Sequence, residues 1–282
     1  MSATADNAST NHGDTQAVLA FRGIDSARFL QGQLSIDAEK LARGASTLAG
    51  LHNPQGRVIA LLGITRTSAE EFLAVLPREL AAGVVQRLRK YVLRAKVTIA
   101  DVSAEYRVYG AFAEPSTGVA SIAWGNRRLL LTTEADEIFD APGADPDKWN
   151  LADILQGMPQ VYTATSELFV AQMLNLDLLG AIAFDKGCYT GQEVIARAHY
   201  RGKVKRRMQR WLNAGQTILK PGDAARASDG RALSVVRAAP VDEGQAVLAV
   251  GNFGAVAAET DPVPGDTVTL RGPLDLPYSL PE

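Results

Sequence analysis

The stretch from Asp185 to Arg207 holds the residue types best suited to chemistry, because it contains the only cysteine of the chain, Cys188. Gly187 and Gly191 flank this residue, and Lys186 lies two positions before it. A free cysteine is most often buried and inert. Here the glycines allow close approach, and the nearby ammonium favours a thiolate over a thiol. We therefore expect a reactive or ligand-exchanging thiol.

A helix is predicted to begin directly after this cysteine. Thr190 and Glu193 have the spacing of a capping box, in which a hydroxyl and a carboxylate satisfy early helix N–H groups. The predicted helix starts near Thr190. Cys188 would then lie just outside the positive end of the helix dipole, which also favours a thiolate.

The same stretch is strongly basic. From Lys186 to Arg210 there are eight Lys or Arg residues against one acid, in a chain whose formal net charge is −2. A charge run of this kind is usually a solvated face. Such a run can also attract a polyanion through electrostatic forces and the release of counterions. Tyr200 and Trp211 are the only aromatic stacking partners near the basic run, so a dedicated RNA-binding surface is the lesser interpretation.

A single cysteine limits the metal chemistry of the chain. It excludes an intrachain disulfide and favours the reducing cytoplasm. Iron–sulfur and cysteine-rich zinc sites usually need about four ligands, and His12, His52 and His199 are scattered without a metal-binding spacing. We expect no metal bound by this chain alone. The thiol could form a mixed disulfide, accept a transferred group, or supply one ligand beside those of a partner.

The remaining sequence predicts an α+β body followed by a barrel. Strand and helix patterns interleave without a strict alternation and without a glycine-rich phosphate loop, which argues against a doubly wound nucleotide fold. Ferredoxin-like split units fit best. From about Arg206 onward, short strands separated by Gly, Pro and Asp turns favour a small β-barrel. We predict a disordered tail at 1–14, two interleaved, partly discontinuous ferredoxin-like domains at 15–204, and a barrel at 205–282.

The individual elements follow from local patterns. Helices are expected after Asp25, from Pro77 and over 149–155. Strands are expected at 17–22, 57–64, 72–76, 96–100, 107–113, 127–133, 211–212, 233–236, 246–250 and 267–270. The first fourteen residues lack an apolar core and carry no Lys or Arg, which argues against a secretory signal or a transit peptide. No run of about 18 apolar residues is present to span a membrane.

Several motifs together resemble one family. The segment KGCYTGQEVIAR followed by RGKVKRR is similar to the signature of the YgfZ-type members of the folate-binding YgfZ/GcvT family, relatives of the aminomethyltransferase of the glycine cleavage system. Similar blocks lie at 23–25 with 29–33, 90–91 with 96–99, 149 with 157–159, 172–177 and 276–279. The resemblance implies two ferredoxin-like domains and a barrel around a central hole that binds tetrahydrofolate. It also implies a role in assembling or maintaining certain iron–sulfur enzymes, including enzymes that modify transfer RNA.

The resemblance further implies roles for individual residues. Cys188 would be the functional thiol, and Trp149 would line the folate site. Glu193 could hydrogen-bond the pterin ring besides capping its helix. With Trp149, the cofactor-binding residues implied by the cysteine motif are Lys186, Gly187, Tyr189, Gly191, Gln192, Glu193, Arg197 and Arg201. Folate with its glutamate tail, or transfer RNA, would be the polyanion attracted by the basic run.

Departures from the family pattern bear on the activity. Aminomethyltransferases carry acidic residues shortly after the glycine of the turn that matches Asn53 to Gly56, whereas this chain reads Ile59-Ala60-Leu61-Leu62. Ordinary aminomethyl transfer is therefore disfavoured, and whether the chain is an enzyme stays open. Gln16 and Ala171 stand where relatives carry a tryptophan and often a proline.

We expect a tetrahydrofolate-binding accessory protein for iron–sulfur proteins, with Cys188 as its thiol. One alternative is a folate-dependent one-carbon transferase or demethylase, and another is a transfer-RNA-binding module. The expected setting is a cytoplasmic monomer, away from membranes, that works with iron–sulfur client or cluster-assembly proteins.

Overall fold

The computed structural model describes residues 10–11, 15–111, 120–133, 146–202, 204–253 and 267–281. Its first layer is an antiparallel sheet with the strand order β3-β4-β5-β2-β6. The strands are β2 (Gln16–Arg22), β3 (Ser46–His52), β4 (Val58–Arg66), β5 (Glu71–Pro77) and β6 (Thr98–Asp101). Strands β4, β5 and β2 are apolar and buried over almost their whole length, as expected for strands covered on both faces.

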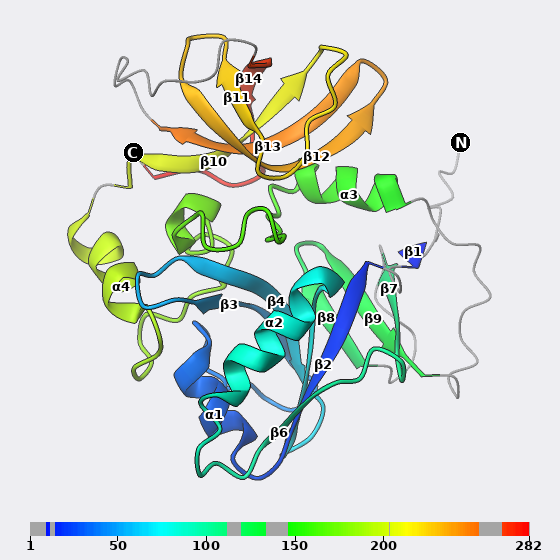
Figure 1. Cartoon of the computed structure of the whole chain (residues 1–282), viewed down its shortest axis with the longest axis vertical. Coiled ribbons are helices and arrows are strands. Elements are labelled where there is room, and N and C mark those ends of the chain that lie inside the picture. Colours follow the sequence, from blue (N-terminus) through cyan, green and yellow to red (C-terminus); the bar gives the residue numbers. More distant parts are fainter. Residues whose placement is uncertain are drawn as a thin grey trace, which may run out of the picture.

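Two helices pack against this sheet, α1 (Ser26–Gln33) and α2 (Arg78–Arg89) (Figure 1). Helix α2 begins at Arg78, one residue after the predicted start, with Pro77 as its N-cap. Its buried side chains recur with helical spacing: Leu80, Ala81, Val84, Val85 and Leu88. Helix α1 follows Asp25, as predicted, but the Asp25 carboxylate does not cap the helix. It accepts a hydrogen bond from the backbone N–H of Lys96 at 2.7 Å instead.

A second antiparallel sheet has the strand order β1-β7-β9-β8. It contains β1 (Thr10–Asn11), β7 (Arg107–Ala111), β8 (Ala120–Trp124) and β9 (Arg127–Thr132). Strand β8 packs on β3 and β4 of the first sheet, and Gly63 permits this approach because a Cβ there would lie 2.7 Å from Cγ2 of Ile122. Strand β1 belongs to the stretch predicted as a disordered tail, yet it pairs with β7. The rest of that tail lies outside the described residues.

The C-terminal strands close into a five-stranded barrel with the order β10-β13-β12-β11-β14. They are β10 (Arg206–Asn213), β11 (Ala224–Ala227), β12 (Ala232–Val241), β13 (Gly244–Asn252) and β14 (Thr269–Leu274). The parallel pair β11 and β14 lies among antiparallel neighbours. The barrel has its own apolar core, which includes Trp211, Val235, Val247 and Leu270. The predicted α+β body with a C-terminal barrel is confirmed.

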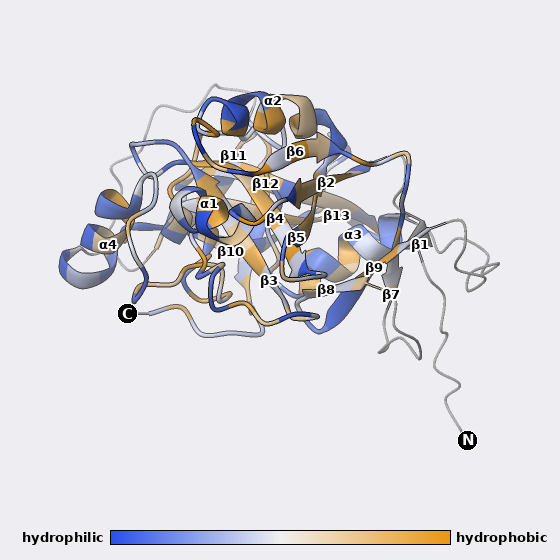
Figure 2. Ribbon diagram, turned by 90° about the horizontal axis from the view of Figure 1, so that it is seen from below, coloured by the Kyte–Doolittle hydropathy of each residue, from blue (hydrophilic) through white to orange (hydrophobic). Residues whose placement is uncertain are grey.

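The segment between the second sheet and the barrel contains α3 (Pro146–Leu155), the short 3-10 helix η1 (Ala171–Leu174) and α4 (Gln192–Arg201). Helix α3 packs against β12 and β13 of the barrel. Helix α4 projects from the opposite side of the molecule, and both views show this separation (Figures 1 and 2). The connecting segment therefore spreads its helices over two distant faces.

Local patterns do not predict β3, β8 and β11. Strand β11 reads Ala-Ala-Arg-Ala and has no branched or aromatic residue, and β3 contains a buried glycine. Both strands pair with longer, more apolar neighbours, β12 and β4, so tertiary context outweighs weak local preference. Within the described residues, the helices are too short and too polar to cross a membrane.

Candidate functional site

Cys188 lies in the loop that leads into α4, and it is exposed to solvent. Gly187 before it is also exposed, and a Cβ at that position would meet no atom within 4 Å. Tyr189 after it is buried. The loop therefore displays the thiol beside open space while the next side chain is fixed in the interior. This arrangement excludes the alternative of a buried, inert cysteine.

Lys186 is turned away from this open space. Its ammonium group donates hydrogen bonds to the backbone carbonyls of Gln31 (2.7 Å), Leu34 (2.7 Å) and Ile36 (2.5 Å), at the end of α1 and just beyond it. An ammonium has three N–H donors, so all of them are used. The expected direct stabilisation of a thiolate by Lys186 therefore lacks a free donor. Burial lowers the pKa of Lys186 to about 8, against the opposing effect of Asp37 and Glu39.

Gly191 docks the start of α4 onto the turn between β3 and β4. Its φ is +84°, and a Cβ there would lie 2.5 Å from the backbone oxygen of Asn53. The Asn53 side chain holds this turn, because its Oδ1 accepts from the N–H groups of Gln55 and Arg57, each at 3.0 Å. A glycine is required at 191 both for the backbone conformation and for the close approach.

The start of α4 is capped differently from the prediction. Helix α4 begins at Gln192, close to the predicted Thr190, but its N-cap is Gly191 and no side-chain cap hydrogen bond forms. The predicted capping box of Thr190 and Glu193 is therefore absent. Gly191 in the left-handed region directs the chain into the helix instead, which leaves the Glu193 side chain exposed.

Helix α4 presents a basic and aromatic face. Only Ile195 of this helix is buried, whereas Arg197 and Arg201 are exposed and have no ion-pair partner within the described part of the chain. Tyr200 is 67% exposed. Its ring meets two stacked rings edge-on, those of Phe184 and His199, whose centroids are 3.8 Å apart. Sequence reasoning missed this cluster, because Phe184 lies in a loop rather than on the helix.

The later part of the basic run is not a uniform surface. Arg207 is buried and forms two hydrogen bonds with the carboxylate of Asp177, at 2.9 and 2.8 Å. Trp211, considered above as a stacking partner, is fully buried in the barrel. Lys205 remains exposed, and Lys203 lies outside the described residues. The packing of β10 decides this for Arg207 and Trp211, because most side chains of this strand are buried.

His52 lies beneath the loop that carries Cys188 and was not singled out from the sequence. Only 1% of its surface is exposed, and neither ring nitrogen has a hydrogen-bond partner among the described residues. Its ring centroid is 6.2 Å from that of Tyr189, and its Cβ would lie 3.1 Å from a Cβ at Gly191. Burial lowers the pKa of His52 to about 3. No sequence signal marks this residue.

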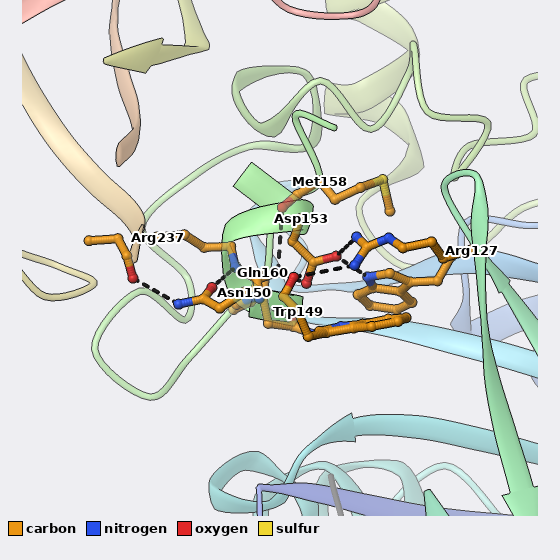
Figure 3. A network of polar contacts seen from close by, with 10 residues as sticks. Arg127, Trp149, Asn150, Asp153, Met158, Gln160 and Arg237 are labelled. Carbon is orange, nitrogen blue, oxygen red and sulfur yellow. Dashed lines mark hydrogen bonds and ion pairs between the residues drawn. The ribbon is translucent and has the colours of Figure 1, made fainter. Parts of the chain in front are cut away.

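Trp149 lies in a different place, inside a polar network below the barrel (Figure 3). Trp149 is only 4% exposed. The Arg127 guanidinium lies 4.0 Å from the centroid of its ring, and Gly110 packs closely against the six-membered part of the indole. The ring is therefore covered by the protein itself. This geometry disagrees with the role of a stacking platform for a ligand.

The centre of that network is Asp153. Its carboxylate is ion-paired with Arg127 and, at 2.7 Å, with Arg237, and it accepts a hydrogen bond from the Trp124 indole at 2.9 Å. Asn150 extends the network, accepting from Nε of Arg237 at 3.0 Å and donating to the carbonyl of Ala238 at 2.8 Å. These contacts fasten α3 to both the second sheet and the barrel.

A cavity of about 580 Å³ opens beside this network. It lies where α2, α3, the segment 162–164 and β12 meet, and it is lined by Glu79, Asn150, Tyr162, Thr163, Pro221 and Arg237, among others. A second cavity of about 410 Å³ continues along α2 and shares Glu79 and Thr163 with the first. Both cavities lack Cys188 among their lining residues.

The residues expected to form one site therefore fall into two regions. The loop and the first turn of α4 bring together Lys186, Gly187, Cys188, Tyr189, Gly191, Gln192 and Glu193, with Arg197 and Arg201 further along the helix. Trp149 lies in α3, on the other side of the molecule (Figure 1). We name these regions the cysteine loop, residues 185–191, and the Asp153 network, which comprises Asp153, Arg127, Arg237, Asn150, Trp124 and Trp149.

The arrangement of two antiparallel sheets, a connecting segment and a closed barrel defines an aminomethyltransferase-like fold. The crystal structure of the glycine cleavage system aminomethyltransferase T from Bartonella henselae superposes with a TM-score of 0.67, covering 86% of this chain and 78% of that one at 12% sequence identity. At this identity the likeness concerns the fold. No protein-family model matches the chain.

Two relatives extend the comparison to sequence. An uncharacterised protein of Haemophilus influenzae is 33% identical over 195 residues, which are 68% of this chain and 69% of that protein. A protein of an Enterobacter species, named tRNA-modifying protein YgfZ, is 29% identical over 305 residues, covering 95% of this chain and 93% of the relative. The chain belongs to the YgfZ/GcvT family as a YgfZ homologue.

Proposed function

We propose that this protein is a tetrahydrofolate-binding accessory protein of the cytoplasm that supports iron–sulfur enzymes, including enzymes that modify transfer RNA, with Cys188 as its functional thiol. The observation that carries the proposal is the exposure of the sole cysteine on a loop held at both ends. A relative named for transfer-RNA modification supports it. In this proposal the two sheets correspond to the interleaved ferredoxin-like domains of the family.

The cavity beside the Asp153 network is the proposed folate site. Its volume of about 580 Å³ lies within the range of small-molecule sites, about 300–1,000 Å³. Tyr162 offers a ring, Arg237 and Asn150 lie at the wall, and Glu79 offers a carboxylate that can accept from amino groups. These side chains fit a heteroaromatic ligand that also carries carboxylates. Bound tetrahydrofolate would supply a carrier for one-carbon groups.

The thiol is tested in cells that lack the protein. Cys188→Ala is expected to accumulate and fold like the wild type, because an exposed side chain away from the core contributes little to stability. It is also expected to leave iron–sulfur enzyme activity unrestored. Cys188→Ser is the second variant, since it keeps the size and polarity of the side chain. Full restoration by either variant would remove the thiol from the mechanism.

The folate site is tested by calorimetric titration with tetrahydrofolate. Trp149→Ala is unsuitable for this purpose because the ring is part of the core. Tyr162→Ala is expected to weaken binding about tenfold, by loss of an aromatic contact. Tyr200→Ala, on the exposed face of α4, is the matched control and should bind as the wild type does. Equal affinities for Tyr162→Ala and the wild type would place the ligand elsewhere.

A second candidate function is direct binding of transfer RNA along α4. The exposed ring of Tyr200 between Arg197 and Arg201 favours it, because single-stranded nucleic acid is bound by stacking rings interleaved with cations. Asp185 and Glu193 are the exposed acids nearby in the sequence. Binding should weaken steeply with salt, and Arg201→Ala should lower the slope of log affinity against log salt by about one. Here Tyr162→Ala is the control, and an unchanged slope would contradict this function.

One-carbon transfer is the remaining alternative, and the structure around β4 gives it little support. The positions that carry acids in aminomethyltransferases are Ile59 to Leu62 here, and all four side chains are buried and apolar. An assay of the purified protein for one-carbon transfer to tetrahydrofolate distinguishes a one-carbon transferase from an accessory protein that only binds folate. We expect no transfer above the uncatalysed rate.

A further inference from the structure

We infer that Lys186 is a positioning residue for Cys188: its ammonium group fastens the cysteine loop to the end of α1 and acts neither on the thiol nor on a bound anion. The inference rests on the proposed function only in treating Cys188 as the working group. It assigns Lys186 a role different from the cofactor contact that the family resemblance implies.

The acceptors of Lys186 form a ring of backbone carbonyls. Gln31, Leu34 and Ile36 lie about the end of α1, where the last carbonyls of a helix lack partners within the helix. A cation there is also favoured by the helix dipole. The Gln31 side chain reinforces the ring, since its Oε1 accepts from the backbone N–H of Ala38 at 2.8 Å. The ring is therefore a preformed receptor for one ammonium group.

Its partners explain why this lysine does not reach an anion. Three carbonyl acceptors occupy the three donors, and the Tyr189 ring centroid lies 4.9 Å from Nζ. The charged groups that act on Lys186 are Asp37 and Glu39, whose negative charges favour its ammonium form. Lys40 is ion-paired with Asp37 at 3.0 Å and stays exposed. The ammonium group thus faces backbone carbonyls and the ring of Tyr189.

The loop is consequently fixed on both sides of the thiol. Lys186 holds it two residues before Cys188, while buried Tyr189 and the close contact of Gly191 with Asn53 hold it afterwards. Only Gly187 and Cys188 in this span are exposed without such an anchor. Limiting the freedom of a reacting group before it meets its partner lowers the entropic cost of the encounter. Lys186 therefore sets the position of the thiol without touching it.

The test compares Lys186→Met with Lys40→Met in the full-length protein. Both changes remove one positive charge near the loop, but only the first removes the donors that enter the carbonyl ring. Cleavage by chymotrypsin after Tyr189 reports how firmly the loop is held, because this side chain is buried until the loop opens. Alkylation of Cys188 by iodoacetamide between about pH 6 and about pH 10 reports the ionisation of the thiol, and the sole cysteine makes the signal unambiguous.

Lys186→Met is expected to be cleaved after Tyr189 at least about tenfold faster, because hydrogen bonds from a charged donor are lost. Its alkylation midpoint should move no further than that of Lys40→Met. Lys186→Arg, which keeps the charge on a planar group, should also be cleaved after Tyr189 faster than the wild type. A wild-type rate of cleavage after Tyr189 in both Lys186 variants would overturn the inference, as would an alkylation midpoint that moves further than in Lys40→Met. Neither measurement needs folate, RNA or a client, so this failure is distinct from failure of the proposed function.

Discussion

The cysteine loop and the Asp153 network are held in opposite ways. The loop is fixed by backbone acceptors and glycine contacts, from Lys186 at one end and Gly191 at the other, and its thiol stays exposed. The network is held by buried charged side chains that pair with one another. An exposed functional group can therefore lie on a well-fixed loop, because none of the contacts that fix this loop uses the thiol.

Breaking the network should have the largest effect on stability. Asp153→Ala would leave the guanidinium groups of Arg127 and Arg237 buried without this carboxylate, and removing one partner of a buried ion pair costs about 3–5 kcal/mol. Chemical denaturation measures the free energy of unfolding. Glu167→Ala is the control, because it removes an ion pair with Arg87 that is well exposed and should cost less than about 1 kcal/mol. Similar losses in the two variants would contradict the contrast between the regions.

The glycines of the loop offer a sharper comparison within a few residues. Gly191→Ala would place a Cβ 2.5 Å from the Asn53 backbone oxygen at a φ of +84°, and we expect a loss of about 3 kcal/mol in the free energy of unfolding. Gly187→Ala meets no atom within 4 Å and should cost less than about 1 kcal/mol. Denaturation curves of the two variants give their free energies of unfolding and so test whether the contact at Gly191 holds the loop. Equal stabilities would show that α4 does not depend on this contact.

His52 links the cysteine loop to pH with a smaller effect. Its folded-state pKa of about 3 lies below the ordinary value of 6.5, so the unfolded chain binds the additional proton and stability is lost as the pH falls from 6.5 towards 3. At pH 5 the loss from this residue should be about 2 kcal/mol. Denaturation at about pH 7.5 and pH 5 measures it, and His52→Phe should remove this share of the pH dependence. An unchanged pH dependence in the variant would exclude His52 as its source.

The elements of the fold could largely be predicted from local sequence patterns. Pro77 marks the start of α2, the apolar runs of β2, β4 and β5 mark buried strands, and the turn-separated strands after Arg206 mark the barrel. The cysteine motif was equally visible, because Cys188 is the only cysteine and lies between glycines before a helix. Strand β11 could not be predicted, since its alanine-rich sequence becomes a strand only beside β12 and β14.

The sequence alone predicts one thiol in a basic, glycine-flanked loop and an α+β body that precedes a barrel. Where the side chains point depends on tertiary contacts. Lys186 meets acceptors that lie 150 to 155 residues away in the chain, and Arg207 turns inward to Asp177. The same holds for the placement of Trp149 far from the cysteine loop (Figure 1). Local preference fixes a residue's backbone state, whereas its partners depend on which distant segments the packing brings beside it.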